Sequence, residues 1–289
     1  MRILVTGALG QLGMSIKAES SKHSEYEFLF TDLEELDISN YDAVEKLVLS
    51  WKPDVLINCA SYNAVDKAED DPMAALLING KAVQSLAGIA RKHDIGLIHV
   101  STDYIFDGKK GSPYTELDEP HPQSKYAHSK FIGEQAVHTA NPRAAIIRTS
   151  WLYSEYGNNF VKTIRKLAAE RDELRVVDDQ KGTPTYAGDL AKAILIMLPA
   201  LKDFKEVRTY NFSNEGLTHW AEFAEAIIDL SKLKCKITAV TTEEYGMSKA
   251  ARPAYSLLDK SKIITEFNLK IPDWRESLSL CIKNLKNNI

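Results

Sequence analysis

The chain has 289 residues, a formal net charge of −4 at neutral pH and an isoelectric point near 6.0. This length allows one large α/β domain, or a large domain with a smaller lobe, around a substantial core. An acidic chain lacks the broad positive field that binds phosphate backbones, so we expect no nucleic-acid partner. Cys59, Cys235 and Cys281 form no Cys-x-x-Cys pair, which argues against disulfides or a thiolate zinc site and fits a reducing cytosol.

The N-terminal segment 1–7 has an apolar run too short for a signal peptide and predicts a strand instead. We expect no later stretch to approach the roughly 18 uncharged apolar residues of a membrane helix, and segment 193–201 is the nearest. These features predict a soluble, cytoplasmic protein without a membrane partner.

Up to residue 212 the chain alternates short β-rich apolar runs with longer helical patterns, which is typical of βαβ units around a parallel sheet. Several predicted strands are apolar on both faces, as expected where helices cover both sides of a sheet. The predicted strands are residues 2–6, 26–31, 54–59, 96–101, 144–150, 174–177 and 209–212. The predicted helices are residues 10–22, 41–51, 73–93, 124–139, 160–171 and 188–198.

Beyond residue 215 the pattern changes to a helix capped by Thr218, a short strand at 236–240, mixed loops and a last helix at 273–286. The predicted fold class is therefore α/β, a Rossmann-type doubly wound parallel sheet with a smaller C-terminal α+β substrate lobe. We assign residues 1–150 and about 158–214 to the dinucleotide-binding domain. Residues 151–157 and 215–289 are assigned to the substrate-binding lobe.

A glycine-rich turn follows the first strand, where residues 6–13 read Thr-Gly-Ala-Leu-Gly-Gln-Leu-Gly. Its three glycines would permit a tight turn, close approach of the backbone to a pyrophosphate, and close packing of helix on strand. The turn predicts dinucleotide binding rather than an ordinary flexible loop. The residues expected at the cofactor here are Gly7, Gly10, Gln11, Leu12 and Gly13.

Asp32 ends the second strand, 19 residues beyond Gly13, where a carboxylate can accept hydrogen bonds from the adenosine ribose. No Arg or Lys follows immediately to pair with a 2′-phosphate, which favours NADH, although a basic residue from elsewhere in the fold could do so. A solvated loop carboxylate is an equally open interpretation, so the cofactor is NADPH or NADH. Leu33, Asp37 and Ile38 are expected in the same part of the site.

Tyr126 and Lys130 form a Tyr-x-x-x-Lys pair that begins 24 residues after Thr102, at the end of the fourth strand. Four residues along a helix place the two side chains about 40° apart on one face. A phenol holds its proton at neutral pH, and a nearby ammonium lowers its pKa, so Tyr126 is a candidate general acid. The pair alone is common on amphipathic helices, but here it coincides with the glycine turn and a strand-end hydroxyl.

With these motifs the chain resembles the extended short-chain dehydrogenase/reductases over nearly its full length, and among them those that reduce nucleotide-bound deoxysugars. The stretches that carry the resemblance, besides the glycine turn, are residues 58–69, 101–104, 148–153, 157–160, 179–185 and 252–253. Ala-Val-Asp-Lys-Ala-Glu at 64–69 and Arg-Thr-Ser-Trp at 148–151 are more specific than the glycines.

The resemblance implies NAD(P)H-dependent reduction of the C4 ketone of dTDP-4-dehydro-L-rhamnose to dTDP-L-rhamnose, which supplies surface polysaccharides. It implies that Thr102 hydrogen-bonds the carbonyl, Tyr126 protonates it, and Lys130 holds the nicotinamide ribose and tunes Tyr126. The cofactor would also contact Cys59, Ala60, Ser61 and Tyr62. The sugar or its diphosphate would contact Val65, Asp66, Thr102, Asp103, Trp151, Asn159 and Arg252.

Two positions depart from the family pattern. Cys59 stands where a small Ala is common, and we interpret it as a packed thiol rather than a reactive one. Some family members dimerise through magnesium held by carboxylates, one of them just after the third glycine, but here Met14 and Ser15 follow. This argues against a magnesium-bridged dimer and leaves a homodimer open. The histidine spacings predict no catalytic metal.

The sequence also predicts where His128 and several aromatic side chains lie. His128 is expected on the outer helix face, and Trp220 with Phe223 in the core of the small lobe rather than in a stacking platform. Tyr104 and Tyr153 fit either sheet packing or the lining of a cleft.

Two other functions compete with the reductase. Sugar-nucleotide dehydratases and epimerases share the fold, but such dehydratases carry an Asp-Glu pair after the Thr, whereas here Tyr104 follows Asp103. A non-catalytic regulatory subunit, like the related methionine adenosyltransferase β subunit, is disfavoured by the full set of Thr102, Tyr126 and Lys130. The nucleotide base and the sugar stereochemistry are not determined by the sequence.

Overall fold

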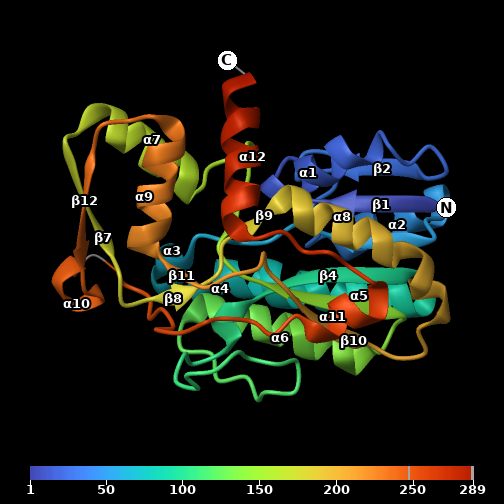
Figure 1. Ribbon diagram of the computed structural model, residues 1–289. Coiled ribbons are helices and arrows are strands. Elements are labelled where there is room, and N and C mark those ends of the chain that lie inside the picture. Colours follow the sequence, from blue (N-terminus) through green and yellow to red (C-terminus); the bar gives the residue numbers. More distant parts are fainter. Residues whose placement is uncertain (247, 288–289) are drawn as a thin grey trace.

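A six-stranded parallel sheet forms the centre of the computed structural model, which describes residues 1–246 and 248–287 (Figure 1). The strands lie in the order β10-β5-β4-β3-β1-β2, and every neighbouring pair is parallel. Their bounds are β1 (Arg2–Thr6), β2 (Glu27–Thr31), β3 (Val55–Asn58), β4 (Gly96–Thr102), β5 (Ala144–Thr149) and β10 (Arg208–Phe212). The predicted α/β fold class is confirmed.

Helices cover both faces of this sheet, which explains why β3 and β5 are buried at every residue. Alternating strand residues point to opposite faces, so Ile3 joins one core and Leu4 the other. The first core lies under α1 (Gln11–Ser20) and α8 (Ala187–Met197). The second lies under α2 (Tyr41–Trp51), α5 (Val83–Lys92) and α6 (Lys125–Ala140).

The helix predicted at 73–93 runs from Pro72 to Lys92, but its middle turn, Leu77–Ala82, is a π-helix between α4 (Pro72–Leu76) and α5. The wider turn presents Asn79, whose side chain bonds the backbone N–H and C=O of Tyr62 at 2.9 and 3.0 Å. The same side chain bonds the hydroxyls of Ser61 and Ser129 at 2.9 and 3.0 Å. Asn79 therefore connects the loop after β3 to helix α6, as π-turns at functional sites often do.

Segment 193–201 was expected to come nearest to a membrane helix. Among the described helices, however, Pro72–Lys92 is the one long and apolar enough to cross a membrane. Segment 193–201 is therefore not the nearest candidate. The charge of Lys81 interrupts the apolar run, so a search for uncharged stretches misses it. Half of its apolar window is buried inside the protein, and the helix packs on α6, as a core helix does.

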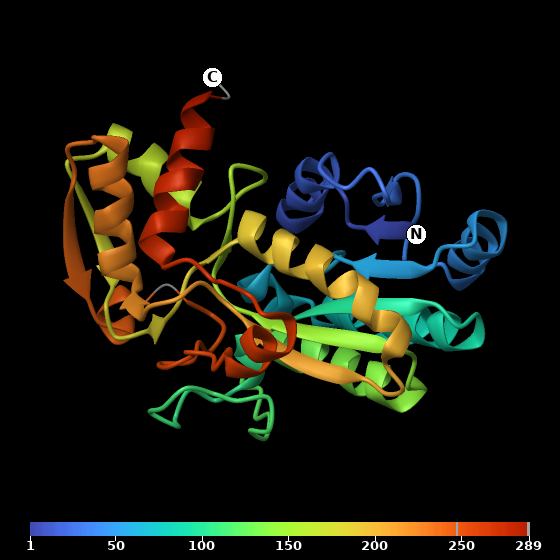
Figure 2. The same ribbon diagram turned by 45° about the vertical axis from the view of Figure 1, so that its right-hand side comes forward.

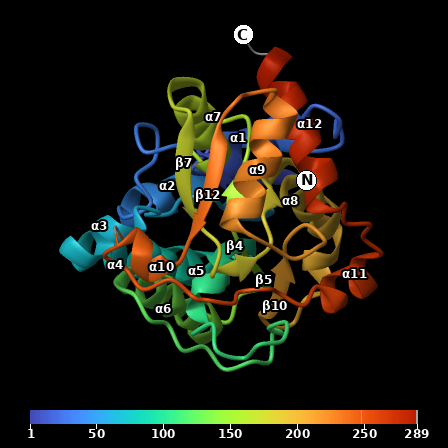
Figure 3. The ribbon, with the colours of Figure 1, turned by 60° about the vertical axis from the view of Figure 1, so that its left-hand side comes forward.

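A smaller lobe stands at the carboxyl end of the sheet, opposite the N-terminus (Figure 2). It contains α7 (Phe160–Glu170), β7 (Glu173–Val177), α9 (Trp220–Ser231), β12 (Lys236–Val240) and α12 (Trp274–Asn287). Strand 174–177, expected among the strands of the main sheet, pairs instead with β12 (Figure 3). Its residues alternate between buried and exposed, so it has one solvated face and does not suit a sheet covered on both sides.

The boundary between the lobes stays a prediction. The packing groups α7 and β7 with α9 and α12 around Phe223 and Trp274, which favours a small lobe that begins before residue 215. The remaining short elements are α3 (Val65–Asp70), β6 (Leu152–Tyr153), β8 (Lys181–Gly182), β9 (Thr185–Tyr186), β11 (Thr218–His219), α10 (Thr242–Tyr245) and α11 (Ser261–Phe267). Two 3-10 helices cover Asp103–Ile105 and Leu198–Asp203.

Gly133 lets α6 approach the π-turn, because a Cβ there would lie 2.2 Å from the backbone oxygen of Asn79. We expect Gly133→Ala to lower the free energy of unfolding by at least about 1–3 kcal/mol, the usual cost of overpacking, in urea denaturation. Gly88→Ala in α5 is the matched control, since no atom lies within 4 Å of its Cβ. That change should stabilise by up to about 1 kcal/mol, and equal effects of both variants would contradict the expectation.

Candidate active site

The groove that holds the predicted site opens at the carboxyl ends of β1 and β3. Strand β2 pairs with one side of β1 and β3 with the other, so the connections diverge here, at the point where doubly wound sheets bind ligands. Two cavities of about 290 and 300 Å³ share Gly10, Cys59, Ser61 and Asn63 and so form one groove.

The glycine turn is shaped by close backbone contacts. Gly7 has a φ of +66°, and a Cβ there would lie 2.5 Å from the amide nitrogen of Ala60. A Cβ on Gly13 would lie 2.4 Å from the carbonyl oxygen of Gly7, so Gly13 serves packing and does not line the groove. Gly10 offers α1 no side-chain cap, which leaves N–H groups of the first turn available for an anion. The turn therefore fits a pyrophosphate.

The cavity of 300 Å³ contains most of the residues predicted for the adenosine part of a cofactor. Asp32 accepts hydrogen bonds from the N–H groups of Leu9 at 2.7 Å and Leu33 at 2.8 Å, so its carboxylate also braces the glycine turn. None of the described lining residues is basic. The predicted residues that line this cavity are Gly7, Gly10, Asp32, Leu33, Asp37, Ile38, Cys59, Ala60, Ser61 and Tyr62.

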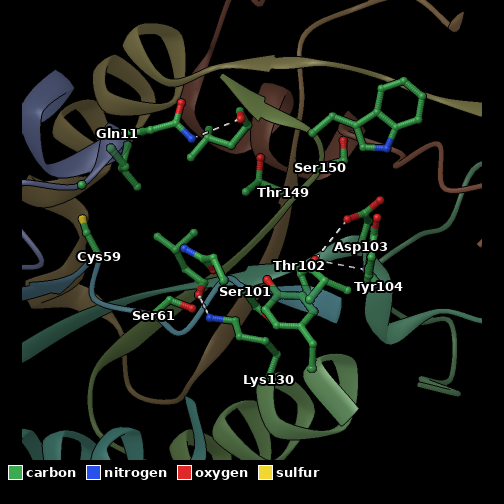
Figure 4. A pocket seen from close by; sticks show the side chains of 18 of the residues that line it. Gln11, Cys59, Ser61, Ser101, Thr102, Asp103, Tyr104, Lys130, Thr149 and Ser150 are labelled. Atoms are coloured by element: carbon green, nitrogen blue, oxygen red, sulfur yellow. Dashed lines mark hydrogen bonds between the residues drawn. The ribbon is translucent and has the colours of Figure 1, made fainter. Parts of the chain in front are cut away.

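The cavity of 290 Å³ brings the predicted proton-transfer residues together (Figure 4). Thr102 ends β4, while Tyr126 and Lys130 project from α6, whose start is capped by Ser124. Tyr126 and Lys130 are 8% and 3% exposed, so both act in a low-dielectric setting. Lys130 donates a hydrogen bond of 2.6 Å to the carbonyl oxygen of Val100. The predicted residues that line this cavity are Gly10, Gln11, Leu12, Cys59, Ser61, Val65, Thr102, Asp103, Tyr126, Lys130 and Trp151.

Burial dominates the titration of this cluster. It raises the pKa of the Tyr126 phenol, against the opposing hydrogen bond with Thr102, so the phenol keeps its proton at neutral pH. Burial also lowers the pKa of Lys130 to about 8, although Glu134 and Cys59 oppose this. The expected lowering of the phenol pKa by the ammonium is therefore not what this geometry produces. Burial raises the pKa of the Cys59 thiol to about 12, which suits a packed, protonated thiol.

Three residues predicted at the substrate lie outside both cavities. Asp66 pairs with Arg252 at 2.8 Å and accepts hydrogen bonds from the N–H groups of Lys249 and Ala250, so it anchors that segment. Arg252 lines a separate cavity of about 310 Å³ between α7 and β7. Asn159 caps α7 and donates a hydrogen bond of 2.9 Å to the side chain of Gln11. It thus connects the glycine turn to the small lobe.

Trp151 lies in the groove with a left-handed backbone, at a φ of +47°. Its indole stacks on that of Trp220, with ring centroids 3.7 Å apart and planes at 13°. Trp220 touches the small-lobe core, as expected, but it also lines the cavity. A strained conformation of a bulky residue, held by stacking at a site, points to a positioned contact surface.

The groove contains polar residues that the sequence analysis did not single out as site residues. These are Asn63, Ser101, Thr149 and Ser150. The last three stand at or just beyond the ends of β4 and β5, so the rule that ligands meet the carboxyl ends of parallel strands would have found them. Of the two undecided tyrosines, Tyr104 lines the groove and Tyr153 is fully buried in the small-lobe core. Within residues 1–246 and 248–287, no group of three His, Cys, Asp or Glu side chains is arranged to hold a metal ion.

A groove that receives a dinucleotide at one end and holds a proton-donating phenol at the other suits the reduction of a carbonyl. The fold and the site together define a nicotinamide-dependent oxidoreductase of the extended short-chain dehydrogenase/reductase class.

Comparison with known proteins narrows this class. Residues 1–287 match the family model described as the RmlD substrate binding domain, and the chain belongs to this family, that of the dTDP-4-dehydrorhamnose reductases. A dTDP-4-dehydrorhamnose reductase from Aggregatibacter actinomycetemcomitans is 42% identical over 285 residues, which cover 96% of this chain and 97% of that protein.

Two solved structures of dTDP-4-dehydrorhamnose reductases share the fold. That from Clostridium acetobutylicum is 40% identical with a TM-score of 0.93, covering 99% of this chain and 100% of its own. That from Bacillus anthracis, in complex with NADP, is 38% identical with a TM-score of 0.91, covering 98% and 99%. The predicted family resemblance is confirmed.

The crowding at Gly7 gives a prediction. Gly7→Ala should weaken NADH binding roughly 10- to 100-fold, measured by fluorescence titration, because the added methyl displaces the loop at Ala60. Gly111→Ala is the control, since its φ is +70° but its Cβ would meet no atom within 4 Å. Equal losses of affinity in both variants would contradict the prediction that crowding at Ala60 weakens NADH binding.

Proposed function

We propose that this protein catalyses the NAD(P)H-dependent reduction of the C4 ketone of dTDP-4-dehydro-L-rhamnose to dTDP-L-rhamnose. The observation that carries this is the buried, protonated Tyr126 phenol beside Thr102, in the same groove as the glycine turn. Membership of the dTDP-4-dehydrorhamnose reductase family supports the choice of substrate.

The roles of the side chains follow from their chemistry. A bound nicotinamide supplies the hydride. Tyr126 donates its proton to the ketone oxygen, and the hydroxyl of Thr102 hydrogen-bonds the same oxygen. The ammonium of Lys130, fixed by its hydrogen bond to the carbonyl oxygen of Val100, would hold the ribose of the cofactor. Thr102, Tyr126 and Lys130 are themselves buried, which limits their contact with water.

The nucleotide end of the substrate is proposed to extend from the groove towards the small lobe. Trp151 and Trp220 present a stacked apolar surface at this end of the groove. Trp220 also lines the neighbouring cavity that contains Arg252, so the two cavities meet there. The guanidinium of Arg252 suits the diphosphate, with Asp66 orienting it.

A dehydratase or epimerase is disfavoured by the state of Tyr104. It occupies the position of the glutamate base, its ring meets that of Tyr126 edge-on at 6.0 Å, and its hydroxyl faces Arg252. Burial raises the pKa of Tyr104, so the phenol cannot take a proton from the sugar at neutral pH. A non-catalytic regulatory subunit would show no turnover and would co-purify with a larger enzyme.

We further infer a cytoplasmic enzyme that acts on a free nucleotide sugar. Whether it forms a homodimer is decided by sedimentation of the purified chain, with and without magnesium.

Tyr126→Phe tests the central role. We expect kcat to fall about 10²- to 10⁴-fold, because the ring is kept but the proton donor is lost. NADH binding should be unchanged. Turnover is followed as loss of NAD(P)H absorbance with a panel of 4-keto nucleotide sugars. Tyr41→Phe, on the exposed surface of α2, is the control. A near-normal kcat for Tyr126→Phe would contradict the mechanism.

The acidic adenosine cavity predicts a cofactor preference. Asp32 and Asp37 line it and no described lining residue is basic, so a 2′-phosphate meets repulsion without a partner. We expect kcat/KM to be several-fold higher with NADH than with NADPH, in parallel assays at one substrate concentration. A higher value with NADPH would show that a cation from outside this cavity reaches the phosphate.

A further inference from the structure

Asp103 follows Thr102 directly, and its carboxyl group is buried in the wall of the groove with 1% of the residue exposed. One carboxyl oxygen, Oδ1, accepts a hydrogen bond of 3.1 Å from the Thr102 hydroxyl. The other, Oδ2, is buried without a hydrogen-bond partner. A charged carboxylate with a buried, unpaired oxygen is costly, so the site favours the neutral acid.

The single hydrogen of the Thr102 hydroxyl is already engaged when Asp103 is ionised. A hydroxyl has one hydrogen and two lone pairs. Thr102 gives its hydrogen to Asp103 and accepts a hydrogen bond of 3.2 Å from the N–H of Tyr104. In this state Thr102 has no hydrogen left for the ketone oxygen of a substrate.

We propose that Asp103 is a positioning residue that works as the neutral acid, donating its O–H to Thr102 and so turning the Thr102 hydrogen towards the substrate ketone. The inference rests on the proposed function and extends it. The lone pairs of Thr102 are then filled by the O–H of Asp103 and the N–H of Tyr104. The ketone oxygen then receives the hydrogens of both Thr102 and Tyr126. Two donors aimed at the oxygen where negative charge develops stabilise the transition state.

The surroundings of Asp103 place its titration in the working pH range. The groups that face it are the phenols of Tyr104 and Tyr126, both kept neutral by burial, and beyond them Arg252, which is paired with Asp66. Burial raises the pKa of Asp103 to about 7, against the opposing effects of the Ser256 and Thr102 hydroxyls. Asp103 is therefore neutral below this pH and ionised above it, so kcat should fall as the pH rises through about 7.

The first test compares the pH dependence of kcat in the wild type and in Asp103→Asn. The amide can donate an N–H to Thr102 at every pH and has no ionisation. We expect Asp103→Asn to keep kcat within a few-fold of the wild type in mild acid and to lose the fall above neutral pH. Asp42→Asn, at an exposed position on α2, should keep the wild-type profile. A fall that persists unchanged in Asp103→Asn overturns the proposal.

A double-mutant cycle with Thr102→Val separates action through Thr102 from direct contact with the sugar. If Asp103 acts through Thr102, then Asp103→Asn changes neither kcat, KM nor the pH profile once Thr102 is a valine. If Asp103 binds the sugar itself, Asp103→Asn raises KM in both backgrounds, and the proposal is wrong.

Difference infrared spectroscopy of the NADH complex reports the protonation of Asp103 without any turnover. We expect the C=O band of a neutral carboxylic acid in mild acid, which is lost above neutral pH and missing in Asp103→Asn. Absence of the band in the wild type overturns the proposal even if a variant fails to fold. Failure of the wild type to reduce any 4-keto nucleotide sugar would instead refute the proposed function, and the band would still decide the state of Asp103.

Discussion

The close contact between α6 and the π-helical turn at Leu77–Ala82 fixes the geometry on which the active site depends. Because Gly133 has no side chain, α6 lies directly against the backbone of Asn79. The side chain of Asn79 then holds Tyr62 in the cofactor loop on one side and Ser129, next to Lys130, on the other. One buried amide thus sets the distance between the loop proposed to receive the cofactor and the helix that carries Tyr126, the proposed proton donor.

The groove combines this rigid frame with polar groups that the fold leaves unsatisfied. Ser101 Oγ and Asp103 Oδ2 line the groove and are buried without hydrogen-bond partners, one near the end of β4 and one just after it. A buried polar atom without a partner costs about 1–3 kcal/mol. These unpaired atoms lie near Thr102, at the end of β4. A substrate bound beside Thr102 would supply hydrogen-bond partners for them. The buried setting also keeps His99 and both groove tyrosines uncharged, so the local field is dominated by Lys130.

The two lobes are connected at the point where a cofactor phosphate would lie. Gln11, the first residue of α1, accepts hydrogen bonds from Asn159 at 2.9 Å and Ser154 at 3.1 Å. Asn159 in turn begins α7, whose buried face packs into the small-lobe core. Gln11 therefore links the glycine turn to the small lobe through Asn159.

The sequence by itself determined the six strands of the main sheet, the glycine turn and the shared helix face of Tyr126 and Lys130. These features follow from patterns within a few residues of one another: apolar runs, glycine spacing and a separation of four positions on a helix. Tertiary structure alone decided that β7 pairs with β12 and that Trp220 reaches the groove. It also brought Asp66 to Arg252 and Asn159 to Gln11. It also decided that burial, rather than Lys130, sets the pKa of Tyr126. Such outcomes depend on contacts between residues as far as 186 positions apart and on the loss of solvent, neither of which leaves a local pattern in the chain.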